Sequence, residues 1–276
     1  MPIPSQIDRV PVIIPFYRER EKLERCLAHL RAQTYPAVEI FVRDNTFDNV
    51  YFTAAVNEGL QKYCYDPAIR YVVVLNQDAY LAPDAIQVLV DFLENNPESG
   101  IACPLQLAAG GQVSWGGSLR AFPFGEHRCS PFESYTSATE TYWANGAALV
   151  VRTQVVREVG LWDRNLRFIA SDADFSFSAR ARGWKIHVVP AARCEHNLKS
   201  SAAGGSSVDV NLIKAKDALY FARKWVSGDL YKGLSYEGAS LTRMGVRTAV
   251  EDLERYIECT AAQVERLRAS NIEDRA

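Results

Sequence analysis

The chain has 276 residues, of which 48% are hydrophobic and 23% are charged, a composition ordinary for a globular protein with a sizeable core. Its formal net charge of −2 excludes the strongly basic surface of a nucleic-acid-binding protein, so we expect no nucleic-acid partner. The six cysteines form no Cys-x-x-Cys pair, which argues against a zinc site or redox motif and favours free thiols in a reducing, cytoplasmic setting.

The first hundred residues alternate between short apolar runs and amphipathic stretches. The β-branched runs predict buried strands, and apolar residues at i, i+3, i+4 and i+7 predict helices. Strands are expected over residues 9–16, 37–45, 70–78 and 100–105, and helices over residues 18–34, 49–64 and from Pro83 onward. This alternation predicts an α/β fold of Rossmann-like type, with a mostly parallel sheet flanked by helices and right-handed crossovers.

The second hundred residues are less regular. The glycine-rich residues 108–119 predict a hairpin or loop, and residues 120–141 predict a loop over a site. A strand is expected over residues 142–152, a helix over residues 171–183, and a further strand over residues 184–190.

Two helical stretches close the chain, over residues 208–226 and about 243–269, after a glycine- and serine-rich linker or mobile loop at residues 202–207. We therefore expect a domain over residues 1–207 and a helical extension over residues 208–276 packed on it. The apolar stripe of the last helix would pack across the domain or join two copies in a homodimer. The cationic face of the 208–226 helix is either solvated or holds a phosphate or anionic lipid head group.

No apolar run is long enough to span a bilayer, and the start of the chain shows no signal-peptide pattern. We expect a cytoplasmic protein, with peripheral contact at the inner face of the membrane as an additional hypothesis.

Polar side chains follow three of the predicted strands. The first strand ends at Pro15, Phe16 and Tyr17, the second at Asp44, and the third at the Asn76–Gln77–Asp78 run. In open parallel sheets, ligands bind at the carboxyl ends of the strands, so we predict a polar ligand site at this rim. The Asp78 carboxylate suits Mg²⁺ or Mn²⁺ beside a diphosphate, although it would equally begin the turn before the next helix.

Other candidates lie in the second half of the chain. Asp172 and Asp174 stand near a predicted helix start, where they would act as a general base or simply oppose the helix dipole. His196 follows a strand and would be either a metal ligand near Asp78 or a hydrogen-bonded structural residue. Trp143, before Asn145, would be a stacking surface for a sugar or base, or part of the core.

These segments, in this order, resemble family 2 glycosyltransferases with the GT-A fold. The matching motifs are VPVIIPFYRERE, VRDNTFDN, AVNEG, VVVLNQDAYLAPDA, GAALVVRTQVVREVGLWD, DADFSFSARARGWK and VPAARCEHNLKSS. The resemblance covers about residues 9–225. Each motif is weak alone, and their order and spacing carry the resemblance.

The resemblance implies roles for the residues that match the motifs. Asp78 matches the metal-binding member of a DxD-type motif, and His196 matches a histidine that completes the metal site in some members. Asp172 matches the usual catalytic base, and Asp174 matches the next acid. Trp143 and Asn145 stay weaker candidates for the acceptor side. The positions that match the family's donor site are Pro15, Phe16, Tyr17, Asp44, Asn57, Asn76 and Gln77.

The sequence also departs from the family pattern. Asn76 replaces the first acid of the DxD motif, and Ser171 replaces the glutamate that usually precedes Asp172. The second change leaves the choice of base between Asp172 and Asp174 open.

The resemblance implies an inverting glycosyltransferase with a UDP- or dTDP-linked sugar donor, a divalent Mn²⁺ or Mg²⁺ cofactor, and a glycan or lipid-linked acceptor. Rhamnose is one candidate sugar, because LNQDA looks like the corresponding rhamnosyltransferase motif. One alternative is a non-catalytic nucleotide- or glycan-binding protein with a degenerate transferase fold. Another is a sugar nucleotidyltransferase, although PFYRERE has no glycine for a phosphate loop.

Overall fold

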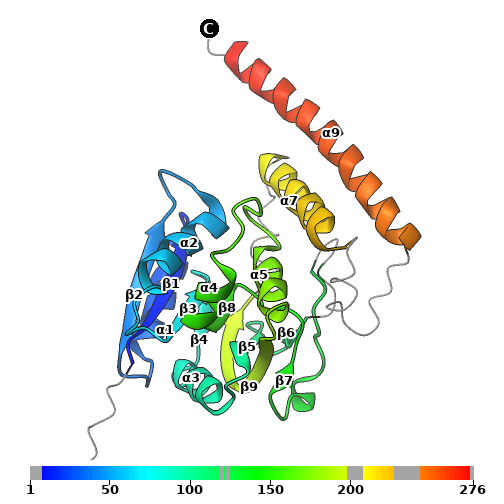
Figure 1. Cartoon of the computed structure of the whole chain (residues 1–276). Helices are drawn as coiled ribbons and strands as arrows, with labels where there is room; N and C mark the ends of the chain where they lie inside the picture. Colours follow the sequence, from blue (N-terminus) through cyan, green and yellow to red (C-terminus); the bar gives the residue numbers. More distant parts are fainter. Residues whose placement is uncertain (1–7, 119–120, 122–124, 198–207, 227–242, 274–276) are drawn as a thin grey trace, which may run out of the picture.

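The structure is a computed structural model that describes residues 8–118, 121, 125–197, 208–226 and 243–273, shown in Figure 1. The predicted linker at residues 202–207 lies outside the described residues.

A single sheet forms the centre of the protein. Its strand order is β2 (Val38–Asp44), β1 (Val10–Phe16), β3 (Tyr71–Leu75), β8 (Ala148–Arg152), β5 (Ser99–Leu107), β9 (Lys185–His196) and β4 (Ala79–Leu81). Two short strands lie off this path: β6 (Val113–Trp115) pairs with β5, and β7 (Thr139–Glu140) pairs with β9.

The sheet is mixed but mostly runs one way. β1 is parallel to β2 and β3, and β5 is parallel to β9, whereas β8 is antiparallel to both β3 and β5. Along the path of described strands, five of the seven therefore share one direction, and only β8 and β4 oppose it. The predicted α/β class with a mostly parallel sheet is confirmed. β8 enters this sheet between β3 and β5 and runs against both of them.

The helices cover both faces of the sheet, because neighbouring residues of a strand point to opposite sides. Val12 and Ile14 of β1 pack with α1 (Arg20–Arg31) and α3 (Ala85–Asn95). Ile13 packs on the other face with α2 (Tyr51–Tyr63), α4 (Thr153–Val159) and α5 (Ser171–Arg180). A short 3₁₀ turn, η1 (Phe132–Ser134), lies in the connection between β6 and β7.

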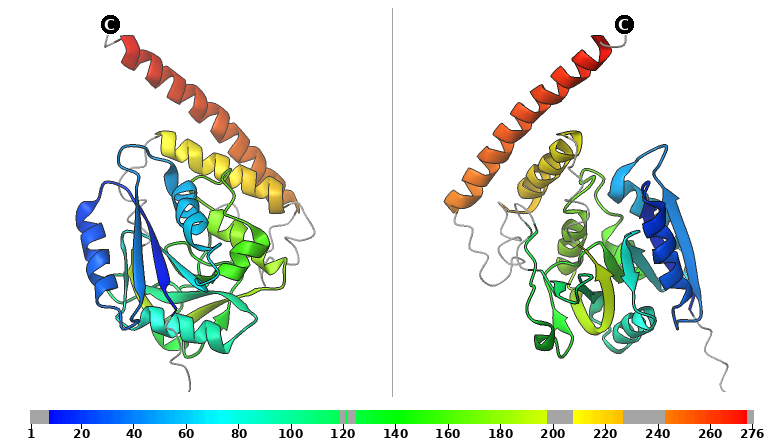
Figure 2. Two further views of the ribbon diagram at one scale, coloured as in Figure 1. Left: turned by 60° about the vertical axis from the view of Figure 1, so that its left-hand side comes forward. Right: turned by 180° about the vertical axis from the view of Figure 1, so that it is seen from behind.

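The C-terminal extension consists of α7 (Val208–Phe221), a π-helical turn η2 (Ala222–Val226) and the long α9 (Arg243–Glu273). Figure 2 shows α9 running alongside α7, which separates it from α5. A third apolar cluster joins the extension to the domain through residues of α5, α7, η2 and α9, among them Phe177, Phe221, Trp225 and Leu253. Within the part of the chain that the structure describes, no helix is long and apolar enough to cross a membrane.

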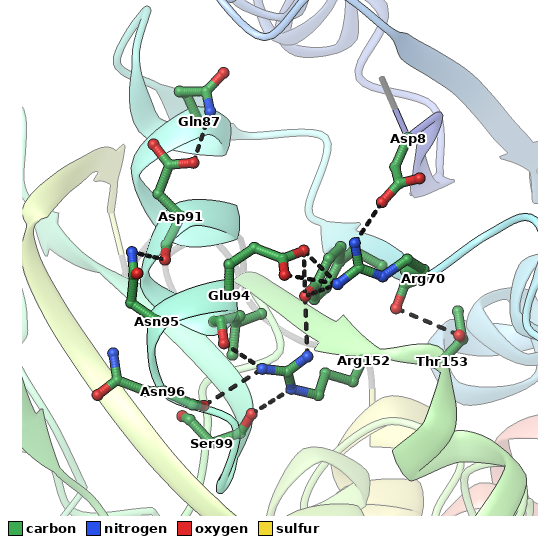
Figure 3. A network of polar contacts seen from close by, with 12 residues as sticks. Asp8, Arg70, Gln87, Asp91, Glu94, Asn95, Asn96, Ser99, Arg152 and Thr153 are labelled. Carbon is green, nitrogen blue, oxygen red and sulfur yellow. Dashed lines mark hydrogen bonds and ion pairs between the residues drawn. The ribbon is translucent and has the colours of Figure 1, made fainter. Parts of the chain in front are cut away.

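A polar network ties the sheet together at the end opposite the carboxyl ends of β1 and β3 (Figure 3). The Arg152 guanidinium donates to the backbone carbonyls of Leu93, Asn96 and Ser99, where α3 ends and β5 begins. It also donates to the Tyr71 hydroxyl, 2.9 Å away. A cation at a helix C-terminus meets carbonyls that lack helical partners and opposes the negative end of the helix dipole.

We predict that Arg152→Met lowers the free energy of unfolding by about 2–4 kcal/mol, because the half-buried carbonyls around it lose a charged donor. Urea unfolding at pH 7 measures the change. Arg70→Met is the matched control: the Arg70 side chain is 49% exposed and its ion pairs face solvent, so the expected loss is about 1 kcal/mol or less. Equal losses in the two variants would contradict the role given to Arg152.

Candidate active site

Hydrogen bonds join the carboxyl ends of neighbouring strands. The Asn45 N–H, just after β2, donates to the Phe16 carbonyl at 2.8 Å. The Gln77 side chain, just after β3, accepts the Tyr17 N–H at 2.6 Å and donates back to the Tyr17 carbonyl at 3.3 Å. Three strand ends are therefore held in one row, with the predicted rim residues along it.

The row continues onto β8 and α5. The Asn76 N–H donates to the Ala147 carbonyl at 2.8 Å, and the adjacent Gly146 N–H donates to Asp172 Oδ2 at 2.8 Å. The structure thus brings the acid near the start of α5 to the same rim as the Asn76–Gln77–Asp78 run, although about 95 residues separate them along the chain.

At the β2 end of the row, the predicted donor residues differ in exposure. Phe16 is buried and Pro15 is half-buried, whereas Tyr17 and Asp44 are exposed. The Thr46 hydroxyl and its backbone N–H, which lies 2.8 Å from Asp44 Oδ1, hold the pKa of Asp44 below its usual value. Asp44 is therefore a fixed negative charge at the edge of the rim at neutral pH.

Asp78 and His196 meet because the chain reverses after Asp78. β4 begins at Ala79 and pairs antiparallel with β9, with Ala79 opposite His196. Asp78 Oδ1 lies 3.7 Å from His196 Nε2, and Asp78 Oδ2 lies 3.9 Å from the Lys22 ammonium of α1. Sequence reasoning missed Lys22; its only signal was a cation on the polar face of the helix that follows the first strand.

The tautomer of His196 follows from its contact with Gln106. His196 Nδ1 lies 3.1 Å from Gln106 Oε1, and with the amide in this orientation the tautomer that bonds to it carries its proton on Nδ1. Nε2 then presents a lone pair, and it is buried without a hydrogen-bond partner among the described residues. A lone pair facing a carboxylate, backed by an amide that orients the ring, fits a divalent cation.

Asp78 and His196 would supply only part of a coordination shell. No group of three or more His, Cys, Asp and Glu side chains able to hold a metal ion occurs among the described residues. Two protein ligands suit Mg²⁺ or Mn²⁺ when phosphate oxygens and water complete the shell.

Asp172 is held tightly although it is half-buried. Its Oδ1 accepts the Ala173 N–H and its Oδ2 accepts the Gly146 N–H, each at 2.8 Å. A Cβ at residue 146 would lie 3.3 Å from Asp172 Oδ2 and from the Phe52 ring, so glycine permits the close approach. Burial raises the pKa of Asp172 despite these hydrogen bonds. Each oxygen keeps a further acceptor position, so the carboxylate suits proton abstraction.

The backbone before Asp172 is strained. Ala170 has φ 62° and ψ 1°, in the left-handed region that costs a residue with a side chain about 1–3 kcal/mol. Such a conformation persists only where surrounding contacts impose it.

Asp174, the other acid that the sequence leaves open as a candidate base, has different surroundings from Asp172. It is 3% exposed, and its Oδ1 accepts the Trp225 indole N–H at 2.6 Å and pairs with the Lys224 ammonium at 2.8 Å. Residues two apart on an α-helix point roughly 200° away from each other, so the two carboxylates face opposite sides of α5.

The Asn57 amide lies inside the domain. It is fully buried, donates to the Trp162 carbonyl at 2.8 Å, and accepts the Trp162 N–H at 2.9 Å. A Cβ at Gly59 would lie 2.6 Å from Ile13, so this glycine lets α2 pack closely on β1. The contacts given for both residues are therefore packing contacts inside the domain.

The weaker acceptor candidates are both buried. Trp143 is 4% exposed and Asn145 is 7% exposed, and Asn145 Oδ1 accepts the Ala147 N–H at 2.9 Å. The Trp143 ring lies 5.4 Å from the ring of His127, a residue that sequence reasoning missed. Burial, with a smaller effect of His196, lowers the pKa of His127 to about 4. Trp143 and His127 therefore pack together as two neutral rings.

Comparison with known protein families gives two matches. Residues 71–249, more than half of the chain, match the model of glycosyl transferase family group 2, and residues 12–49 match the model of glycosyl transferase family 2. The second match contains β1 and β2, and the first contains the remainder of the rim.

Comparison with individual proteins points the same way. An N-acetylglucosaminyl-diphospho-decaprenol L-rhamnosyltransferase of Mycobacterium tuberculosis is 25% identical over 240 residues, covering 70% of this chain and 78% of the relative. A probable glucomannan 4-beta-mannosyltransferase of Arabidopsis thaliana is 29% identical over 144 residues, covering 52% of this chain and 25% of the relative. The crystal structure of GalNAc-T7 with UDP, GalNAc and Mn²⁺ has a TM-score of 0.62 at 15% identity; the match covers 94% of this chain and 58% of that one, and it shows the fold.

We predict that Asn57→Ala lowers the free energy of unfolding by about 2–4 kcal/mol, because the Trp162 N–H and carbonyl both stay buried without their partner. Asn49→Ala is the control: Asn49 is exposed and accepts the Tyr51 N–H, so about 1 kcal/mol or less is expected. Urea unfolding compares the two variants. If Asn57→Ala keeps wild-type stability but weakens nucleotide binding, Asn57 belongs to the donor site and its packing role is wrong.

Proposed function

Because the chain belongs to glycosyl transferase family group 2 and is thus a glycosyltransferase that uses a nucleotide sugar, we propose that it is an inverting enzyme. It moves a sugar from a UDP- or dTDP-linked donor to a hydroxyl group of a glycan or lipid-linked acceptor. The observation that carries this proposal is the half-buried Asp172 carboxylate, bonded to Gly146 on the same rim of the sheet as the Asp78–His196 pair.

In this proposal Asp172 is the general base. It takes the proton of the acceptor hydroxyl while that oxygen attacks the anomeric carbon opposite the leaving diphosphate, which inverts the configuration. The Gly146 and Ala173 N–H groups orient the carboxylate, and the raised pKa of Asp172 makes it a stronger base than an exposed aspartate. Asp174 is not assigned to this step, because its carboxylate is already paired with the Lys224 ammonium and accepts the Trp225 indole N–H.

Asp78 and His196 would hold the divalent cation, with Gln106 keeping His196 in the ligating tautomer. The cation, when bound, supplies positive charge against the departing diphosphate. Lys22, which faces Asp78 and Glu19, adds a mobile positive charge to the same side of the site. Tyr17 and Asp44 are the exposed residues on the nucleoside side.

The choice of donor and acceptor draws on the relatives. One is named for transfer of L-rhamnose to N-acetylglucosaminyl-diphospho-decaprenol, and the solved neighbour was crystallised with UDP, GalNAc and Mn²⁺. These names support a rhamnosyl or another hexosyl donor and a lipid-linked acceptor, and the latter would bring the enzyme to a membrane surface.

We predict that a nucleoside diphosphate, UDP or dTDP, stabilises the protein only in the presence of Mn²⁺ or Mg²⁺. A ligand at about 100 times its Kd adds about 2.7 kcal/mol to the free energy of unfolding, which a thermal-shift assay detects. Asp78→Ala and His196→Ala should abolish the metal-dependent part of the shift. Gln106→Leu should weaken metal binding about 10- to 100-fold, because it releases the His196 ring.

Glu195→Gln is the control for this series, because Glu195 neighbours His196 but pairs with Arg25. It should retain the full shift. A metal-independent shift that survives in Asp78→Ala would remove Asp78 from the metal site. The absence of any nucleotide effect in the wild-type protein would favour a degenerate binding protein.

We predict that Asp172→Asn lowers kcat for sugar transfer about 10²- to 10⁴-fold while the nucleotide-induced thermal shift is retained. In the wild type, activity requires the ionised carboxylate, so it falls as the pH drops through the pKa of Asp172. Since burial raises that pKa, the acid limb of the pH–rate profile should lie above the usual aspartate value of about 4. Unchanged turnover in Asp172→Asn would exclude Asp172 as the base.

A further inference from the structure

The segment that leads into α5 is held from two sides. It comprises residues 163–170 and connects α4 to the helix that carries Asp172. On one side, the Thr53 hydroxyl of α2 donates to the Leu166 carbonyl, and the Thr53 N–H donates to the Arg167 carbonyl at 3.2 Å. On the other side lies α7, above α2 and α5 in Figure 1.

Asp217 of α7 is the main contact on that second side. It is 1% exposed, and its Oδ2 accepts the N–H groups of Phe168 at 2.6 Å and Ile169 at 3.0 Å. A buried carboxylate is costly unless hydrogen bonds satisfy it, and here the donors come from the backbone immediately before the strained Ala170. Asp217 therefore contributes directly to imposing the left-handed conformation from which α5 starts.

α7 and η2 also bond to the other end of the segment, at Asp163. The Tyr220 hydroxyl donates to Asp163 Oδ2 at 2.9 Å, and the Lys224 ammonium lies 2.9 Å from the same oxygen. Lys224 and Trp225 then reach Asp174 on α5 itself. One face of α7 and η2 thus bonds to the start of the segment, to its end, and to the first turn of α5.

Aromatic packing backs these polar contacts. The Phe177 ring of α5 lies 5.8 Å from that of Phe221 and 5.6 Å from that of Trp225, the latter edge-on. α5 is therefore fixed on the face that carries Asp174, which leaves the other face, with Asp172, directed at Gly146.

We propose that the C-terminal helices α7 and η2 are the positioning element for Asp172, and that Asp217 and Trp225 act as positioning residues through the 163–170 segment and Asp174. This inference rests on the proposed function, in which Asp172 is the base. Neither residue touches the reacting atoms. Their effect is to hold the Asp172 carboxylate within the small range of positions from which it can take a proton, and a displacement of about 1 Å can cost about 10²-fold in rate.

Asp217→Leu tests the proposal, with Asp217→Asn as the conservative variant and Lys216→Leu as the control at the exposed neighbouring position. Asp217→Leu should lower kcat about 10- to 100-fold with less than a threefold change in the donor KM. The Mn²⁺-dependent thermal shift with UDP or dTDP should be unchanged, because the Asp217 carboxylate bonds to the backbone of Phe168 and Ile169 and to none of Asp44, Asp78 and His196 in the described part of the chain. Asp217→Asn keeps an accepting oxygen and should restore most of the rate, and Lys216→Leu should match the wild type.

If Asp217→Leu does not fold, Trp225→Phe serves in its place, because it keeps an aromatic ring at the position and removes only the N–H that binds Asp174. The same loss of kcat with an intact nucleotide shift is expected. A lowered melting temperature with unchanged kcat in the folded variant would overturn the proposal, since that is the result of a purely structural role.

The ¹³C carboxyl chemical shift of Asp172, followed against pH, tests the proposal without any assay of activity. The pKa of Asp172 should be raised in the wild type and should return toward the usual aspartate value in Asp217→Leu or Trp225→Phe, as water enters around the displaced carboxylate. An identical titration in all variants would overturn the positioning role. If the pKa of Asp172 falls in the variants as expected, but the wild type transfers no sugar, the proposed function is rejected and the positioning role is kept.

Discussion

The row of hydrogen bonds across the carboxyl ends of β2, β1, β3 and β8 is the constraint on which the rest of the site depends. Each strand ends with a polar group that meets the next strand: Asn45 with Phe16, Gln77 with Tyr17, and Asn76 with Ala147. The ends of the strands leave backbone groups in need of partners. The Phe16 and Ala147 carbonyls accept backbone N–H groups of Asn45 and Asn76, and the Gln77 side chain satisfies the Tyr17 backbone. The same groups set the positions of Asp78 and Asp172, because each stands within two residues of a member of the row or bonds to its neighbour.

Two reversals then convert this row into a site. β8 runs against β3, so its first residues lie beside the last residues of β3 and bring Gly146 to the rim. β4 runs against β9, so Asp78 faces His196. A purely parallel sheet would place the end of β9 and the start of β8 at different edges. The antiparallel strands are therefore what bring the two acids and the histidine of the proposed mechanism to one edge.

The C-terminal helices are integrated with the domain through buried polar contacts. Asp174 and Asp217 are both nearly inaccessible, and both are bonded across the boundary at residue 208, one to Trp225 and the other to the backbone at Phe168. A buried carboxylate is costly unless donors satisfy it. These contacts therefore favour the one arrangement of the C-terminal helices in which the donors meet both carboxylates, which apolar packing alone would not specify. This specificity is what links α7 to the orientation of Asp172.

The sequence by itself determined the elements and most of the rim. Continuous β-branched apolar runs identified the strands, such as the one around Ile13, and stripes of period 3.6 identified the helices around Leu23 and Leu89. The polar residues after each strand identified Tyr17, Asp44 and Asp78 as neighbours. Such patterns are local, because they report only which face of its own strand or helix each residue occupies. They carry no information on which distant segment will pair with which.

Tertiary structure alone decided the remaining assignments. Asp172 and Asp174 are equivalent as a pattern, and only the packing of η2 against one face of α5 separated the half-buried acid from the buried one. Asn57 matched a motif, yet its amide is held by Trp162, 105 residues away. Gln106 has no sequence signal of its own and Lys22 only that of a cation on a helix, because their importance arises from contacts with His196 and Asp78. The physical reason is the same in each case: a polar side chain takes its role from the partner it meets, and that partner is fixed by the fold.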